Sequence, residues 1–403
     1  MKFSKLSQLF LVSILGLVVA TLLTACEIET IDYVFVANSA GTSAGSAGQI
    51  QTYDADSQTG ALRQGAATVS SGGINPVSIA ITADYANLYV VNAGSNNVTH
   101  FALAGNGVLT QKDAITTSAT PVSVTVNTAG TYLYVVSGPS PSTLTAYSLS
   151  SGAIGSVASQ ATLTLPSNTS DIIVPTGVNV LANGAAVYVS SYDKSAYNPG
   201  GVTTSTANPG WVFGYIVGSG GSLALSSGSP YKAGVKPTAL ISDPTNRFVY
   251  VTDFASNELI GYTIQGGSTL DFLINGPFKT GNEPNDIVID PRGIYVYVTN
   301  GLDSTVSAFN ISLATGTPSS VVNVSGSQIN ATDTTPVALV VDPALGRFVY
   351  TANKLGNSVS GFTLNPTTGA LTATQSGPYP TGDQPSALAA VPHGNHSIQT
   401  VSP

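Results

Sequence analysis

Short apolar segments alternate with polar turns along almost the whole chain. One unit recurs: a proline with a short apolar segment, a polar turn, an aromatic-rich segment ending in Asn, Ser or Asp, a second turn, and a third apolar segment. One copy occupies 284–289, 295–300 and 305–311. Apolar runs of ~4–8 residues between turn residues are typical of strands, and no helical periodicity interrupts them. The pattern predicts an all-β fold.

The repeat has a period that identifies its architecture. The spacing between successive anchoring prolines is 45 to 62 residues. Four-stranded blades of a radial β-sheet array repeat every ~40–50 residues, whereas strand-plus-helix horseshoes repeat every ~20–29. The anchoring prolines are Pro76, Pro121, Pro175, Pro237, Pro284, Pro336 and Pro385.

The two ends of the repeat array are each incomplete. The segment 33–38 is an aromatic strand with no proline strand before it, and 385–391 is a proline strand with no aromatic strand after it. Together they make one blade, and pairing them closes the ring and leaves only short edges. We therefore predict a seven-bladed β-propeller of four-stranded blades over residues 32–391, followed by a polar tail at 392–403.

The N-terminus predicts export. Lys2 and Lys5 precede the apolar run 9–23, a pattern typical of a secretory signal peptide. The run is short for a membrane span of ~20 residues. Residues 1–25 are accordingly predicted to be a signal peptide.

The residues at the predicted cleavage point resemble the bacterial lipobox. Leu23–Cys26 reads Leu-Thr-Ala-Cys, and Cys26 is the only cysteine of the chain. The resemblance implies that Cys26 is lipidated and becomes the first mature residue, with 26–31 as a tether to the membrane. Glu27 replaces the aspartate that often retains lipoproteins at the inner membrane, which favours the outer membrane or cell surface. The open alternatives are an uncleaved anchor, or a plain signal peptide with an incidental cysteine.

Composition narrows the possible partners. Charged residues make up 8% of the chain, and the formal net charge is −8. Nucleic-acid binding needs a basic surface, so we expect no nucleic-acid partner. The three histidines have no metal-site spacing, and no phosphate loop or nucleophile elbow is present. We expect no metal and no cofactor.

The repeats are similar to the YVTN and lactonase-like seven-bladed β-propeller family. The resemblance rests on Tyr297–Asn300 (Tyr-Val-Thr-Asn), Tyr250–Asp253 (Tyr-Val-Thr-Asp) and Tyr89–Asn92 (Tyr-Val-Val-Asn), each followed by a short polar turn and another strand. It spans the mature chain and implies the fold more specifically than the function. It also implies that the proline strands line the channel and that ligands meet the mouth beside the prolines.

Charge at this predicted mouth is concentrated on the fifth and sixth blades, at Lys236, Asp253, Glu283 and Asp286. We take this group as the candidate site. Asn300 and Asn353 end neighbouring aromatic strands and are further candidates for ligand binding. Two alternatives stay open: Asn and Asp at strand ends bond to their own backbone, and the charges are ordinary solvated loop charges.

An insertion in the fourth blade, 192–210, is predicted on the same face. A loop of this length is either a functional lid or disordered. Tyr192 and Tyr197 are expected to offer aromatic contact to a sugar or peptide.

Two classes of function remain. The first is a lipid-anchored module that binds a protein, peptide or glycan in the cell envelope. A scaffold for assembly of an outer-membrane complex is a third possibility, which the sequence does not distinguish from the first. The second is a lactonase-like hydrolase, with Glu283 as base and Lys236 stabilising the developing oxyanion. Lactonase-type propellers typically carry Gly-Pro-Arg-His at an inner strand, and the matching positions here have neither Arg nor His. The sequence therefore favours binding over catalysis.

Overall fold

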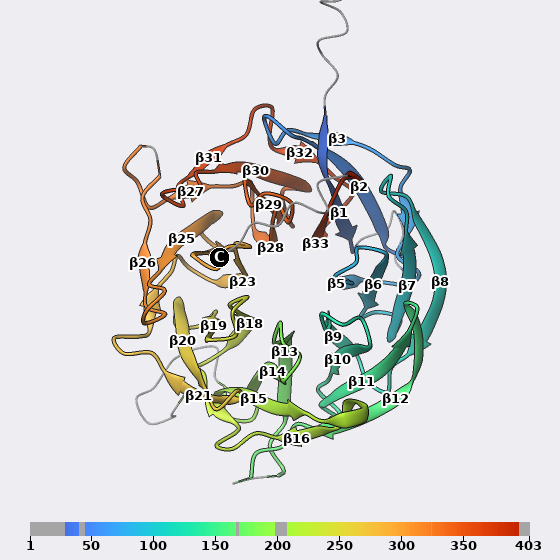
Figure 1. Ribbon diagram of the computed structural model, residues 1–403, viewed down its shortest axis with the longest axis vertical. Helices are drawn as coiled ribbons and strands as arrows, with labels where there is room; N and C mark the ends of the chain where they lie inside the picture. The colour runs from blue at the N-terminus through green and yellow to red at the C-terminus, as the bar shows by residue number, and fades with distance from the viewer. Residues whose placement is uncertain (1–28, 40–44, 167–168, 198–207, 324, 395–403) are drawn as a thin grey trace, which may run out of the picture.

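A computed structural model describes residues 29–39, 45–166, 169–197, 208–323 and 325–394. Their strands form seven antiparallel sheets arranged radially around a channel (Figure 1). Cys26 and the predicted signal peptide lie outside the described residues, as do 198–207 of the predicted insertion and 395–403 of the tail. No helix within the described residues has the length and hydropathy of a membrane span.

The seven innermost strands line the channel, and six of them begin at an anchoring proline. They are β33 (Pro385–Pro392), β5 (Pro76–Ile81), β9 (Pro121–Val126), β13 (Ile173–Val180), β18 (Pro237–Ser242), β23 (Pro284–Ile289) and β28 (Pro336–Val341), in blades 1 to 7. The aromatic-rich strands come next. They are β1 (Thr30–Asn38), β6 (Asn87–Asn92), β10 (Tyr132–Ser137), β14 (Ala186–Asp193), β19 (Phe248–Asp253), β24 (Tyr295–Asn300) and β29 (Phe348–Asn353).

The third strands follow the same order. They are β2 (Gln49–Asp56), β7 (Asn97–Leu103), β11 (Thr143–Ser150), β15 (Gly210–Val217), β20 (Glu258–Gln265), β25 (Thr305–Ile311) and β30 (Ser358–Leu364). Blades 2 and 3 end in continuous outer strands, β8 (Leu109–Thr116) and β12 (Ala153–Thr162).

In the other five blades the outer strand is split into two short pieces that pair with the same third strand. The pieces are β3 (Leu62–Gln64) and β4 (Val69–Ser70), β16 (Leu223–Leu225) and β17 (Tyr231–Lys232), β21 (Thr269–Phe272) and β22 (Phe278–Lys279), β26 (Pro318–Ser320) and β27 (Asn330–Ala331), and β31 (Leu371–Ala373) and β32 (Tyr379–Pro380). A 3-10 turn, η2 (Ser219–Gly221), precedes β16.

The ring closes as the sequence predicts. The C-terminal strand β33 pairs with the N-terminal strand β1, with Phe35 opposite Ala389, and β1 continues outward to β2. The prediction of seven four-stranded blades closed by the chain ends is therefore confirmed.

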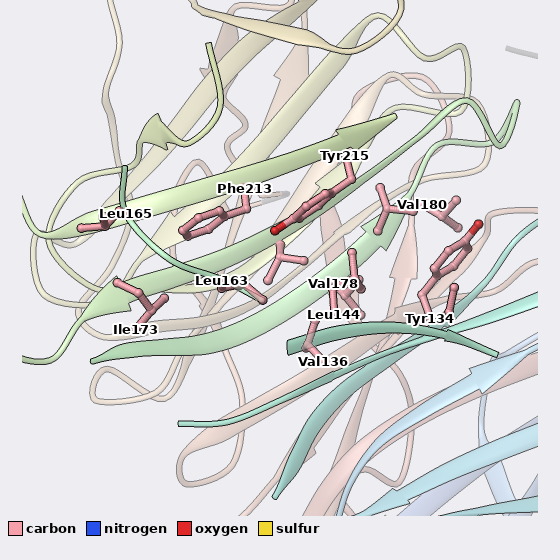
Figure 2. Close-up of a cluster of buried hydrophobic side chains, with 13 residues drawn as sticks. Tyr134, Val136, Leu144, Leu163, Leu165, Ile173, Val178, Val180, Phe213 and Tyr215 are labelled. Carbon is pink, nitrogen blue, oxygen red and sulfur yellow. The ribbon is translucent and has the colours of Figure 1, made fainter. Parts of the chain in front are cut away.

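The core lies between the blades. Residues of β24 alternate in direction: Tyr295 and Tyr297 pack toward blade 7, while Val296 and Val298 pack toward blade 5. Because each sheet is covered on both faces, the second strands are apolar at almost every position. Figure 2 shows the equivalent cluster between blades 3 and 4, which includes Tyr215.

The tyrosine of the YVTN-like segment also ties one blade to the next. In five blades its hydroxyl donates a hydrogen bond to a carbonyl in the outer hairpin turn of the following blade, at 2.5 to 2.9 Å. The pairs are Tyr89–Gly152, Tyr188–Ser268, Tyr250–Gly316, Tyr297–Gly369 and Tyr350–Gly60. The recurring tyrosine is thus a packing and hydrogen-bonding element of the interface between blades.

Candidate functional site

The channel holds a cavity of about 290 Å³ near the mouth at which the inner strands begin. Every residue lining it lies one to three positions after an anchoring proline, and all seven inner strands contribute. The polar members are Ser78, Ser123, Thr176, Thr238, Asn285, Asp286 and Ser386. Asp286 is the one ionisable side chain among the residues lining this cavity.

Asp286 is held by the repeat geometry. A bulge follows Pro284, so the regular pairing of β23 with β24 resumes only at Ile287. Within the bulge the Asp286 backbone N–H donates to Thr299 Oγ1 at 3.0 Å, and its carboxylate Oδ2 accepts from Leu339 N of blade 7 at 2.9 Å. The same strand position of blade 2 is a serine, Ser78, whose hydroxyl accepts from the next inner strand. The carboxylate therefore occupies a place that the fold fills with small or hydroxyl side chains elsewhere.

The surroundings of Asp286 favour its neutral form. Enclosure by the inner strands removes water from the carboxyl and raises its pKa to about 6, against the opposing effect of the hydrogen bonds from the backbone N–H groups of Leu339 and Ile287. A carboxylate with a pKa in this range is suited to accept a proton near neutral pH. Perturbed carboxyl groups in cavities are typical of functional sites.

The predicted pair Lys236 and Glu283 is not brought together in this way. Neither residue lines the channel cavity, and no ion pair between them is found within the described residues. Glu283 has a φ of 55°, its N–H donates to Asn257 Oδ1, and its carbonyl accepts from Gly301 N. The catalytic role of both residues stays a prediction, and Asp286 is the better-placed carboxylate.

Lys236 is instead surrounded by aromatic rings. Its Nζ lies 4.4 Å from the ring centroid of Phe254, 5.4 Å from that of Tyr197 and 5.9 Å from that of Tyr192. The two tyrosines meet edge to face at 5.3 Å. The structure thus places Tyr192 and Tyr197 beside Lys236 at the mouth, where cation–π contact engages the ammonium.

Asp253 accepts hydrogen bonds from the backbone beside the mouth. It is fully buried, and its two carboxylate oxygens accept from Val235 N at 2.7 Å and Lys236 N at 2.8 Å. Gly234 has a φ of 71°, and a Cβ there would collide with Asp253 Oδ2. These contacts give Asp253 a structural role, and its predicted contact with a ligand is not favoured.

The asparagines at the strand ends are bonded within their own blades. Asn300 Nδ2 donates to the hydroxyls of Thr305 and Ser307 at 3.0 and 2.9 Å. Asn353 Nδ2 makes the equivalent bonds to Ser358 and Ser360 at 3.1 and 2.9 Å. Both asparagines are buried. This geometry favours a structural role for the two asparagines over ligand binding.

Sequence reasoning missed the hydroxyl and amide groups that share the channel cavity with Asp286. Asn285 Nδ2 donates to Pro336 O at 3.4 Å, and Thr238 Oγ1 donates to Pro284 O at 2.8 Å, so each links its inner strand to the next. Their shared position directly after an anchoring proline is the signal that identifies them. No cluster of three or more potential metal ligands occurs in the described part of the chain.

Comparisons with known proteins agree with the geometry of the fold. The family model described as "Lactonase, 7-bladed beta-propeller" matches residues 25–126 and 104–398. The chain is similar to a periplasmic gluconolactonase from Pseudomonas aeruginosa (TM-score 0.72, 20% identity), covering 91% of this chain and 100% of that one. It is equally similar to a proposed 6-phosphogluconolactonase from Bacteroides uniformis (TM-score 0.72, 17% identity), covering 90% and 100%. No curated protein matches the chain.

A more distant likeness shows how widely this architecture is used. A hypothetical selenium-binding protein from Sulfolobus tokodaii aligns with a TM-score of 0.60 and 12% identity, covering 91% of this chain and 92% of that one. At such identities the solved structures support the fold alone.

Proposed function

Because the chain belongs to the seven-bladed lactonase β-propeller family, we propose that it hydrolyses a lactone without a phosphate group in the channel cavity around Asp286. The observation that carries the proposal is the single carboxylate of this cavity, with its pKa of about 6. This reverses the order of preference drawn from the sequence, where binding stood before catalysis. Family membership and the enclosed carboxylate together favour the enzyme.

The proposed reaction uses Asp286 as a general base. Its carboxylate takes a proton from a water molecule while the water oxygen bonds to the lactone carbonyl carbon. Collapse of the tetrahedral intermediate breaks the ring C–O bond, and the departing ring oxygen receives the proton from Asp286. The product is a hydroxy acid. A positioned general base contributes roughly 10²–10⁴-fold to such a step.

Neutral donors would stabilise the oxyanion of this intermediate. The cavity holds the amide of Asn285 and several hydroxyl groups, including that of Ser123. Preorganised donors in a site that excludes water stabilise developing negative charge. No lysine, arginine or histidine lines the cavity to supply a full positive charge.

The same lining supports a proposal for the class of substrate. A phosphate dianion beside the Asp286 carboxylate would meet like charge in a poorly solvated space, with no cation among the lining residues to compensate. Lys236 is engaged by three rings at the mouth. These observations favour an uncharged lactone over a phosphosugar lactone.

The test is proton release by a purified soluble form that begins at Glu27. We expect saturable turnover of gluconolactone above the buffer rate and much weaker turnover of 6-phosphogluconolactone. Asp286→Asn is expected to lower kcat/KM by roughly 100-fold or more, and Glu283→Gln to leave it unchanged. The matched control is Asp271→Asn, an exposed aspartate on the outer strand β21.

Two results would overturn the proposal. Absence of turnover with gluconolactone and with aliphatic lactones would rule out the proposed lactone hydrolysis. Full activity of Asp286→Asn together with loss of activity in Glu283→Gln would identify Glu283, the residue predicted from the sequence, as the general base.

We propose further that the protein acts outside the cytoplasm, anchored by lipid on Cys26. This rests on the N-terminal sequence, since the segment lies outside the described residues. An exported location agrees with an unphosphorylated substrate.

A further inference from the structure

Two exposed leucines lie at the mouth of the channel, on the two blades that hold the carboxylate of Asp286. Leu302 of blade 6 and Leu355 of blade 7 are each 66% exposed. They belong to the loops that follow β24 and β29, and both strands end at the mouth, opposite the start of their inner strands. The two leucines therefore present apolar surface on the face at which the channel cavity opens.

The fold does not require leucine at these positions. Blades 2, 5, 6 and 7 use the same four-residue loop between the second and third strands, and in each the last loop residue has a φ of 50° to 59°. The second loop residue is Gly94 in blade 2, Ala255 in blade 5, Leu302 in blade 6 and Leu355 in blade 7. Because glycine and alanine serve the same turn, neither its backbone nor core packing explains the two leucines. Such departures from a local pattern are expected at functional positions.

The loop of blade 6 packs directly on the lining of the channel cavity. A Cβ added to Gly301 would come within 2.2 Å of Nδ2 of Asn285, which lines that cavity. The N–H of Gly301 donates to Glu283 O at 2.9 Å, and the N–H of Leu302 donates to Asn282 O at 3.3 Å. These bonds fix Leu302 one residue away from a contact with the cavity lining.

The loop of blade 7 is held in the same way. The N–H groups on both sides of Leu355 are bonded, that of Lys354 to Thr335 O at 2.8 Å and that of Gly356 to Thr334 O at 3.1 Å. Thr335 leads directly into β28, whose second and third residues line the channel cavity. Both leucines thus stand on loops that are bonded to the segments entering the cavity.

The placement of the leucines favours a small ligand over a protein or a membrane. Sites for those larger partners are marked by contiguous apolar patches of more than a few hundred Å², whereas these leucines lie on separate loops. The strand β1 also runs toward the mouth, where Asn38 pairs with Pro385. Its first residue, Thr30, is nearest in sequence to the predicted lipid anchor and lies at the opposite face.

We propose that Leu302 and Leu355 contact the alkyl chain of a substituted lactone whose ring enters the channel cavity. This inference rests on the proposed hydrolysis and narrows its substrate to a lactone with an apolar substituent. The hydroxyl, amide and carboxyl groups of the cavity suit the polar ring ester. A substituent protruding from the mouth meets the leucines, and each methylene group that is fully buried there strengthens binding by roughly fourfold.

The experiment compares γ-butyrolactone with γ-decalactone, which has the same ring and carries a hexyl chain. Hydrolysis by the soluble form is followed as proton release, and kcat/KM is expected to be roughly tenfold or more higher for γ-decalactone. The double substitution Leu302→Ala and Leu355→Ala gives both loops the residue of blade 5. It is expected to lower the ratio of the two kcat/KM values by roughly threefold or more. The matched control is Leu313→Ala, an exposed leucine after β25 on the opposite face, which should leave the ratio unchanged.

A binding measurement separates this inference from the proposed reaction. Asp286→Asn should bind γ-decalactone in isothermal calorimetry, and should bind it more weakly when both leucines are also replaced. If the wild type hydrolyses neither lactone, the proposed reaction fails and calorimetry decides the inference. Binding that depends on the two leucines then supports it, and absence of binding overturns it.

Two further results would overturn the inference while the proposed hydrolysis stands. One is equal kcat/KM for the two lactones, or a ratio that the double substitution leaves unchanged. The other is sedimentation of the soluble form with phosphatidylglycerol vesicles that the double substitution abolishes, which would assign the leucines to a membrane surface.

Discussion

The carboxylate of Asp286 accepts a hydrogen bond from the backbone N–H of Leu339 at 2.9 Å, so an acid on the inner strand of blade 6 is joined to the inner strand of blade 7. At the equivalent position blade 2 uses the hydroxyl of Ser78. A neutral acceptor therefore satisfies the fold. The fold does not require a negative charge at this position, which is consistent with a functional role for the Asp286 carboxylate.

Replacing Asp286 by Asn is expected to stabilise the protein while it slows hydrolysis. The folded-state pKa of about 6 lies above the ordinary value of 3.8, so the folded state binds the proton more tightly. The stabilisation from protonation is complete below pH 3.8 and is lost as pH rises through 6. At pH 8 the variant should gain about 3 kcal/mol, and at pH 3.5 about nothing. Urea unfolding at both pH values measures the difference, with Asp271→Asn as control; equal gains at both would contradict it.

The pH dependence of hydrolysis should report the same carboxyl group. With Asp286 as base, kcat/KM should rise tenfold per pH unit below about pH 6 and level off above it. Initial rates on gluconolactone, corrected for the buffer reaction at each pH, give the profile. An inflection well below pH 6 would show that Asp286 is not the base.

Ring closure is expected to weaken as pH rises. Asp32 of β1 is fully buried; burial and then the neighbouring Asp342 carboxylate of blade 7 raise its pKa well above the ordinary value. Its contribution to stability is therefore present below pH 3.8 and lost as pH rises through the folded-state pKa. Asp32→Asn should be more stable than wild type at pH 8, with a flatter dependence of the unfolding free energy on pH.

A second aspartate provides a control of opposite sign. Hydrogen bonds from the Ser358 hydroxyl and the Thr334 N–H lower the pKa of Asp333. Its contribution is present above the unfolded-state pKa and is lost as pH falls. Asp333→Asn should cost stability at pH 8, and the cost should shrink as pH falls through the lowered pKa of Asp333. If Asp32→Asn and Asp333→Asn changed the pH slope in the same direction, the assignment of Asp32 would be wrong.

The hydrogen bond between tyrosine and the next blade can be measured by a matched pair of substitutions. Tyr297→Phe removes the bond to Gly369 O and should cost about 1–1.5 kcal/mol. Tyr134 is the equivalent residue of blade 3, but its buried hydroxyl has no hydrogen-bond partner among the described residues. Tyr134→Phe should therefore be neutral or slightly stabilising. Equal losses in the two variants would show that ring packing, and not the hydroxyl, joins the blades.

Lipidation is tested in cells that process lipoproteins. The full chain should incorporate an alkyne-labelled fatty acid and sediment with membranes, and Cys26→Ser should do neither. The matched control is Ser7→Ala, within the predicted signal peptide and away from the cleavage point. Labelling of the Cys26→Ser variant would contradict the prediction, since Cys26 is the only cysteine of the chain.

The strand order and the closure of the ring were readable from the sequence because they depend on local patterns. Each proline, apolar strand and aromatic strand lies within about 20 residues of the next, and the half-repeats at 33–38 and 385–391 complete one another. The turn at Asp290–Pro291 likewise depends on local contacts. Asp290 Oδ1 accepts from Ile294 N and Tyr295 N, both at 2.8 Å, as a local turn requires.

The identity of the channel-facing side chains depends on contacts that no local pattern contains. Glu283 and Asp286 are three residues apart and equally charged in the sequence. The bulge after Pro284 interrupts the alternation of side chains, and the neighbouring inner strand 53 residues away supplies the N–H that holds Asp286. Local sequence determined the blades, and contacts between distant strands decided which residues face the channel.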